Sequence, residues 1–265
     1  MTAIVGIFCR DGIVIGSDSS ATFVTGHTPT IEQKCKKIEI IGDQVILAGT
    51  GTIGLGQRFK EILSNYWSKN EGGGKTPITI ARELAHRAIV DFSSTGVGSG
   101  VIGPSGPLRG QYGALLAFPA EGRFHLVEFQ VQDFQPELKT ADLCFVSMGS
   151  GQNITDPFLG LMRRVFWADP KDSPPNLNEG TFIVTWTLNH VIELNPGGIA
   201  GPPQIAVFDS AKRKARLLSD AEIQEHLGNA QGAEKYLGAY KNVLQEGGRE
   251  KIPPAPSSAS PSAAR

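Results

Sequence analysis

The stretch MTAIVGIFCRDGIVIGSD, residues 1–18, decides the fold because two short apolar runs flank a turn signal. Residues 3–9 and 12–17 are rich in β-branched and other apolar residues, a composition typical of strands. Arg10-Asp11 separates them, and the dipeptide Asp11-Gly12 favours a tight hairpin turn. The chain is therefore expected to open with a β-hairpin.

The same pattern returns before residue 50, and helical spacing begins after it. Residues 38–41 and 44–48 are apolar and flank Gly42-Asp43, which predicts a second hairpin. Two hairpins are thus expected in the first fifty residues. Apolar positions at helical spacing then predict a helix over residues 53–66.

The rest of the chain predicts a mixture of helices and strands. Residues 77–92 have helical spacing, whereas residues 93–110 are rich in Gly, Ser and Pro and predict a loop. In residues 178–194 the β-branched side chains favour a strand, while the length between loop signals favours a helix, and we predict a helix. The other predicted elements are strands at 111–118, 123–129, 143–148 and 204–209, and helices at 156–167 and 219–244.

The order of these elements predicts the fold class. Strands joined as hairpins, rather than strands that alternate with helices, favour antiparallel sheets covered by helices. The order fits an α+β fold with four layers, the αββα sandwich. One domain is expected over residues 2–245, because no internal linker is apparent, and residues 246–265 are expected to form a disordered tail rich in Pro, Ser and Ala.

The composition excludes several classes of function. The 25 basic and 26 acidic residues leave a net charge of −1, which gives no field that would attract nucleic acid or an anionic membrane. Residues 1–6 lack the basic region and the long apolar stretch of a signal peptide, and no apolar run is long enough to span a membrane, so we expect neither secretion by a classical signal nor a membrane span. Three cysteines and scattered histidines predict neither a disulfide framework nor a metal site. We expect a cytoplasmic protein without a cofactor.

Thr2 is followed by Asp18 and then by Lys34 at equal steps of sixteen residues. Removal of Met1, which the small second residue allows, would give Thr2 a free α-amino group beside its hydroxyl. One residue would then carry both a nucleophile and the base that activates it. With the segment TAIVG at residues 2–6, this trio resembles the opening of proteasome β-type subunits and their bacterial relatives.

The resemblance implies an N-terminal nucleophile hydrolase that cleaves peptide bonds as a threonine peptidase. An α-amino group titrates near about 7.7 to 8.0, so the Lys34 cation would help to keep it neutral and basic. Asp18 would hold Lys34 charged and oriented. The family also implies peptide or unfolded protein substrates, a homo-oligomeric ring, and an ATPase regulator that feeds the ring.

The resemblance extends to further site residues. Gly49 matches the family's oxyanion-hole glycine, whose backbone N–H meets the developing negative charge. Ser150 matches a serine that hydrogen-bonds near the threonine amine. Counting back from Gly197-Gly198 places Glu193 at the family's aspartate position, and Pro196 where the family has a serine. Pro196 is a departure from the family pattern, because proline offers neither a hydroxyl nor an N–H.

Three alternatives remain open at the level of sequence. The segment GTGTIG at residues 49–54 fits a dinucleotide fingerprint, although hairpins precede it and only Glu71 stands near the expected acidic position. A non-peptidase amidohydrolase would use the same Thr2. A catalytically silent ring or scaffold subunit is suggested by Pro196.

Overall fold

The computed structural model describes residues 1–25, 28–94, 102–103, 106–107, 111–167, 174–194 and 197–245. The predicted tail and most of the predicted loop at 93–110 lie outside these residues. The strands are β1 (Ile4–Cys9), β2 (Gly12–Ser17), β3 (Ser20–Thr25), β4 (Thr28–Lys34), β5 (Ile38–Ile41), β6 (Val45–Gly51), β7 (Ile102–Gly103), β8 (Gly106–Pro107), β9 (Tyr112–Ala120), β10 (Arg123–Phe129), β11 (Pro136–Leu138), β12 (Phe145–Met148), β13 (Gln204–Asp209) and β14 (Lys214–Leu217). The helices are α1 (Ile53–Ser68), α2 (Pro77–Ser94), α3 (Gln152–Phe166), α4 (Leu177–Leu194) and α5 (Asp220–Gln245).

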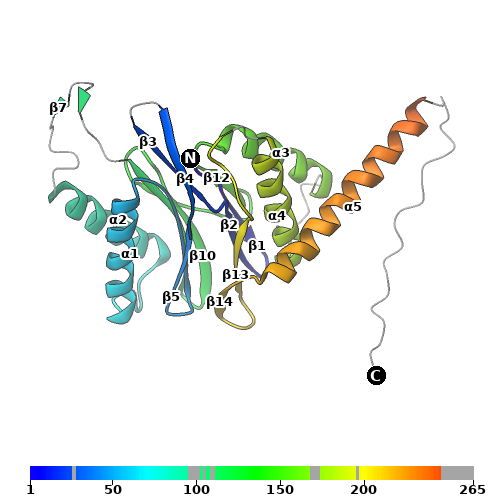
Figure 1. The fold of residues 1–265 in the computed structure, drawn as a ribbon. Helices are drawn as coiled ribbons and strands as arrows, with labels where there is room; N and C mark the ends of the chain where they lie inside the picture. Colours follow the sequence, from blue (N-terminus) through cyan, green and yellow to red (C-terminus); the bar gives the residue numbers. More distant parts are fainter. Residues whose placement is uncertain are drawn as a thin grey trace.

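Two antiparallel sheets form the centre of the molecule. One has the order β12-β1-β2-β13-β14 and the other the order β11-β10-β9-β6-β5. Helices α3 and α4 cover the first sheet, and α1 and α2 cover the second (Figure 1). The four layers are therefore those of the predicted αββα sandwich, and the predicted fold class is confirmed.

The alternation of side chains along β1 explains the layers. Val5 and Ile7 face the helices of the first sheet, whereas Ile4 points toward the second sheet. All three side chains are fully buried, since a strand with both faces covered needs apolar residues at consecutive positions. The hairpin that the opening stretch predicts is present, and Ile4 pairs with Ser17 at its open end.

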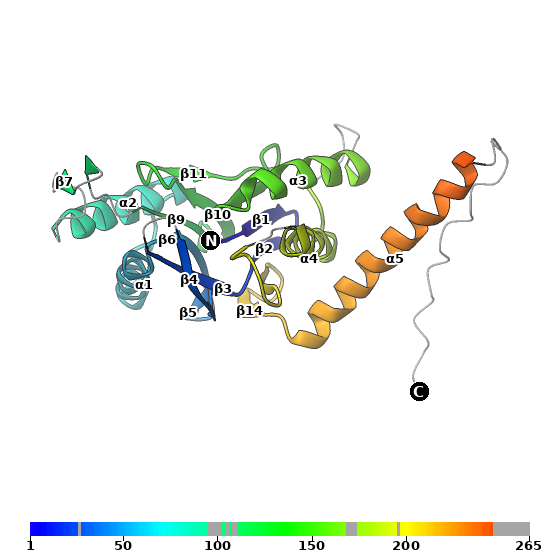
Figure 2. The same ribbon diagram turned by 45° about the horizontal axis from the view of Figure 1, so that its top comes forward.

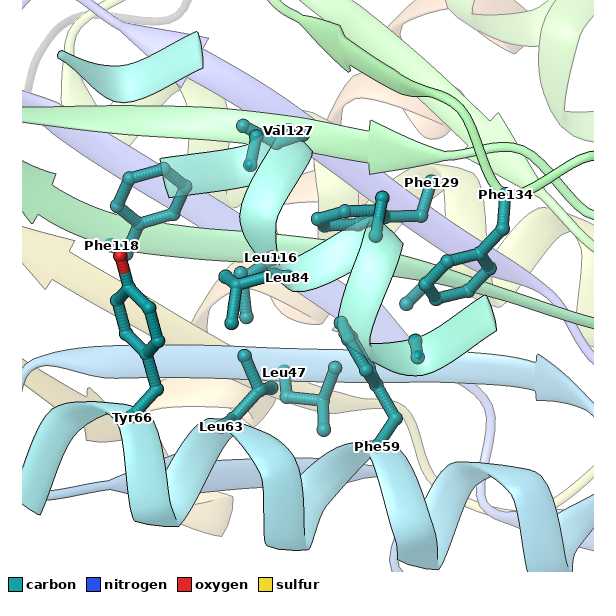
Figure 3. Packing of buried hydrophobic residues seen from close by; sticks show 14 of the residues in the cluster. Leu47, Phe59, Leu63, Tyr66, Leu84, Leu116, Phe118, Val127, Phe129 and Phe134 are labelled. Atoms are coloured by element: carbon teal, nitrogen blue, oxygen red, sulfur yellow. The ribbon is translucent and has the colours of Figure 1, made fainter. Parts of the chain in front are cut away.

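A third cluster of apolar residues fixes α1 and α2 on the second sheet. Phe59, Leu63 and Tyr66 project from α1 toward Leu84 of α2 and Leu47 of β6 (Figure 3). The buried positions of α1 recur three or four residues apart, as on one face of a helix. This packing holds α1 against β6, the strand that directly precedes it in the chain.

Helix α4 confirms the prediction for the ambiguous segment 178–194. Two of its three buried threonines satisfy their hydroxyl groups within the helix: Thr181 Oγ1 donates to the carbonyl of Leu177 at 2.7 Å, and Thr185 Oγ1 donates to that of Thr181 at 2.8 Å. These bonds remove the cost of burying the hydroxyls. The length of the segment thus predicted its structure better than its β-branched residues did.

The hairpin β3–β4 corrects the prediction that two hairpins fill the first fifty residues. Its residues 20–34 are mostly polar and lack an apolar alternation, so no strand was expected there. The hairpin forms a separate two-stranded sheet, and the side chains of residues 31–34 in β4 are exposed. The edge strand β14 was missed for a similar reason, because only Ala215 of its four residues is buried.

Helix α5 packs on the body along its first part only. Ile223 and Ala230 are buried, and Trp186 Nε1 of α4 donates to Glu234 at 2.7 Å. The rest of the helix extends away from the sandwich in both views, with Leu237 exposed (Figures 1 and 2). None of the helices in the described residues has the length and apolar content that crossing a bilayer requires.

Candidate active site

Thr2 and Asp18 meet because the first hairpin brings its two open ends together. The register Ile4↔Ser17 places the residue before β1 beside the residue after β2. The N–H of Ala3 donates to Asp18 Oδ1 at 2.9 Å, and the N–H of Asp18 donates to the carbonyl of Ala3 at 3.2 Å. The backbone itself therefore holds the carboxylate next to Thr2.

The cation at this site is Lys37. Its Nζ lies 2.7 Å from Oδ1 and 2.9 Å from Oδ2 of Asp18, and 3.2 Å from Oγ1 of Thr2. The side chain of Asp18 is 0% exposed and that of Lys37 is 8% exposed. A buried carboxylate needs several donors, and the N–H of Ser20 supplies a further one at 3.1 Å.

The prediction of Lys34 is wrong, and the unpredicted hairpin is the reason. Lys34 is the last residue of β4, where it pairs with Ser20, and its side chain is exposed. The chain then turns inward, with the N–H of Cys35 bonded to the carbonyl of Ser19, and the site is reached three residues later. The sequence did contain a signal for this, because Lys37 directly precedes the apolar strand β5.

Ser150 contacts the backbone of Thr2. Its Oγ accepts a hydrogen bond from the N–H of Thr2 at 3.1 Å. The N–H of Gly151 donates to the carbonyl of Thr2 at 3.1 Å, so the turn binds Thr2 from both sides. Gly149 is required here, because its φ is +93° and a Cβ would lie 2.3 Å from the Thr2 carbonyl oxygen.

Gly49 lies across a pocket of about 280 Å³ that Thr2 also lines. Ala48 pairs with Ile38, the first residue of β5, so Gly49 extends one residue beyond β5 while β9 still pairs with it. Beyond the start of β5, residues 49–51 of β6 line the pocket. Tyr112 packs behind Gly49, and burial raises the pKa of its phenol, which therefore stays neutral.

A methyl group at Gly49 is expected to disturb this wall. The Cβ of Gly49→Ala would lie 2.4 Å from the hydroxyl oxygen of Tyr112, so β6 or the ring must move. We expect a loss of about 1 to 3 kcal/mol in the free energy of unfolding, measured by denaturant titration, and a loss of peptide turnover. The matched control is Gly54→Ala in α1, where a Cβ meets nothing within 4 Å. Equal stability of the two variants would contradict this account of Gly49.

Among the described residues, the carboxylate of Glu193 makes no contact with Thr2. It lies exposed at the end of α4, and Asn189 Nδ2 of the preceding turn donates to its Oε1 at 2.8 Å. The assignment of Glu193 to the site is therefore corrected, and Pro196 lies outside the described residues. A residue that the sequence did not single out lines the same pocket as Thr2: this is Thr22, whose Oγ1 donates to the carbonyl of Gly198 at 3.1 Å.

Met1 is in place and covers part of the site. The hydroxyl of Thr2 donates to the carbonyl of Met1 at 2.7 Å, and Lys37 Nζ donates to the same oxygen at 3.1 Å. Burial first, and then the Lys37 cation, lower the pKa of the Met1 α-amino group. The surroundings of the N-terminus thus favour a neutral amine.

The dinucleotide alternative is contradicted by the sheet that precedes residues 49–54. β6 pairs antiparallel with both β5 and β9, whereas the fingerprint requires a strand in a parallel βαβ unit. In the part of the chain that the structure describes, no group of three or more His, Cys, Asp or Glu residues is placed to hold a metal ion.

Comparisons with known proteins agree with the fold. Residues 2–104 match the family model of the proteasome subunit, which confirms the predicted resemblance. Anbu (ancestral beta-subunit) from Yersinia bercovieri superposes with a TM-score of 0.67 at 11% identity, covering 91% of this chain and 97% of that chain. An Anbu (Gly-1) mutant from Hyphomicrobium sp. strain MC1 gives a TM-score of 0.65 at 14% identity, with coverages of 90% and 97%. A search of curated proteins finds no match.

Proposed function

We propose that this chain, a proteasome-type subunit, is a threonine peptidase whose nucleophile is Thr2 after Met1 has been removed. The observation that carries the proposal is the position of Thr2 Oγ1, 3.2 Å from the ammonium of Lys37, which is itself paired with buried Asp18. A hydroxyl beside a fixed cation is easier to deprotonate, because the cation stabilises the developing negative charge.

The base in this mechanism is the α-amino group that removal of Met1 would create. The nitrogen of Thr2 accepts the proton of its own hydroxyl, and the oxygen attacks the peptide carbonyl. The C–N bond then breaks, and the amine returns the proton to the leaving nitrogen. Water hydrolyses the resulting ester on Thr2 with the amine again handling the proton. Ser150, 3.1 Å from this nitrogen, would orient it.

The oxyanion formed during attack would meet the backbone of Gly49. Residues 49–51 of β6 line the same pocket as Thr2, and they extend beyond the start of β5, so β5 does not cover their edge. An extended substrate chain could follow this edge, with its carbonyl between Thr2 and Gly49. The substrates we propose are peptides or unfolded proteins, cleaved in a homo-oligomeric ring in the cytoplasm, with an ATPase regulator as a further partner.

Removal of Met1 is expected to switch the activity on. While Met1 is retained, the nitrogen of Thr2 is a peptide nitrogen that donates to Ser150 and has no lone pair available as a base. Protein from its native host should therefore have lost one methionine by intact-mass spectrometry and should cleave peptides. The same chain from cells treated with a methionine aminopeptidase inhibitor should retain Met1 and be inactive. Full activity in the Met1-bearing protein would contradict the proposal.

Protein that has lost Met1 can also distinguish the proposed peptidase from two other functions. A non-peptidase amidohydrolase would turn over small amides and leave peptides intact. A silent scaffold subunit would cleave neither, even with Met1 removed. Because Lys37, Asp18, Ser150 and Thr2 are all in contact, the geometry favours an active enzyme over a scaffold.

A further inference from the structure

The pocket beside Thr2 has a charged wall that the mechanism does not use. Glu39 of β5 lies between two lysines: its Oε2 is 3.1 Å from Lys36 Nζ, and its Oε1 is 3.1 Å from Lys60 Nζ of α1. All three residues line the pocket together with Thr2. The wall thus joins strand β5 to the helix that covers it.

The floor beside this wall is apolar. Glu39 pairs directly with Leu47 across β5 and β6, so the two side chains lie on the same face of the sheet. Tyr112 completes the floor behind Gly49. The pocket therefore offers an apolar base for a substrate side chain and a polar wall for its end.

The charges of the wall do not cancel. Burial alone would raise the pKa of the Glu39 carboxyl, but the hydrogen bonds from Lys36 and Lys60 outweigh it and lower the pKa, so the carboxylate stays ionised at neutral pH. One negative charge then faces two positive charges. The Lys37 charge does not enter this sum, because Asp18 is its partner. The wall has a net charge of about +1 at its opening, and each ammonium has donors that Glu39 does not use.

We infer that this pocket selects a substrate whose residue on the acyl side of the cleaved bond has a carboxylate side chain. The inference rests on the proposed function, since Thr2 and Gly49, which would hold the substrate carbonyl, line the same pocket as Lys36, Glu39 and Lys60. The methylenes of a glutamate would lie on Leu47, and its carboxylate would reach the ammonium groups of Lys36 and Lys60. An arginine or lysine side chain would meet two like charges.

The test measures kcat/KM for three peptides that differ only in this residue, which is glutamate, leucine or arginine. The quantity compared between variants is the ratio of kcat/KM for the glutamate peptide to that for the leucine peptide. We expect glutamate to be cleaved best and arginine worst. Lys60→Met should lower the ratio of glutamate to leucine about threefold to fivefold, which is the range of one partly exposed charge pair. Glu39→Gln should raise the ratio by a similar factor, because it removes the competing carboxylate. Lys69→Met, an exposed lysine beyond the end of α1, should leave the ratio unchanged.

The outcomes separate this inference from the proposed function. If peptides are cleaved but leucine or arginine is preferred, or if the ratio does not respond to Lys60→Met, the inference is wrong and the peptidase stands. If no peptide is cleaved by protein with a free Thr2, the proposed function fails and the inference fails with it. If the ratio falls equally in Lys69→Met, a general effect of net charge would replace the pocket as the explanation.

Discussion

Replacing Thr2 with alanine is expected to lower kcat/KM for every peptide substrate by at least about a thousandfold, because it removes the hydroxyl that we propose as the nucleophile. Alanine keeps the backbone N–H that bonds to Ser150 and the carbonyl that bonds to Gly151. The fold should therefore persist, and the melting temperature should change little. Steady-state kinetics and thermal unfolding of the same preparation check both halves of the prediction.

The control for this variant is Thr2→Ser, which keeps a hydroxyl and still allows removal of Met1. It should retain measurable turnover, since the proton still passes between a hydroxyl and the amine of one residue. Turnover by Thr2→Ala at the level of the unmodified protein would mean that another nucleophile does the work. Loss of activity in both variants with loss of the fold would point to a structural role for the side chain.

The second large effect is expected from Lys37→Met, compared with Lys34→Met as its matched control. Lys37 is nearly buried and paired with Asp18, whose side chain has no exposure to solvent. Removing the cation leaves this carboxylate in the interior with the N–H groups of Ala3 and Ser20 as its described donors, which should lower the free energy of unfolding by about 3 kcal/mol. Turnover should also fall by at least about a hundredfold, because neither the hydroxyl nor the amine of Thr2 then has a cation beside it.

Lys34→Met should change neither quantity appreciably, because the side chain is exposed at the end of β4 and surface charges contribute little. Denaturant titration and kcat/KM of the two variants give the comparison. A larger loss in Lys34→Met than in Lys37→Met would restore the assignment made from sequence spacing and would contradict the geometry described here.

The comparison of these two lysines shows where sequence reasoning was limited. The spacing from Thr2 to Asp18 is set by one hairpin with a two-residue turn, whose length its apolar runs and Asp11-Gly12 predict. The spacing from Asp18 to the lysine depends instead on the length of β3–β4, a polar hairpin without apolar alternation. A count of residues could not resolve which of the neighbouring lysines turns inward.

The position of Glu193 could not be predicted from the sequence for another reason. Glu193 was placed by counting back from a glycine pair, but the end of α4 determines where its side chain points. One helical residue more or less rotates a side chain by about 100°. In contrast, Ser150 lies in a short turn directly after β12. Gly149 in this turn approaches the carbonyl of Thr2 closely, so the position of Ser150 could be predicted from the strand and glycine that precede it.

The layers of the fold were easier to predict than the details of the site. Each sheet buries both faces, so its strands are apolar at consecutive positions, and the helices repeat their apolar positions at the expected spacing. These patterns involve many residues and tolerate single exceptions. The site depends on single side chains whose direction a short polar hairpin or a helix end decides.

The most direct test of the central claim is to map the adduct of a peptide epoxyketone by mass spectrometry of proteolytic fragments. This reagent forms its two bonds with a hydroxyl and an amine of one residue, so a double adduct requires both groups on the same amino acid. We expect the adduct on a fragment that begins at Thr2, formed in protein that has lost Met1 and absent from Thr2→Ala. An adduct on any other residue, or no adduct in protein with a free Thr2 terminus, would contradict the claim that Thr2 carries both the nucleophile and its base.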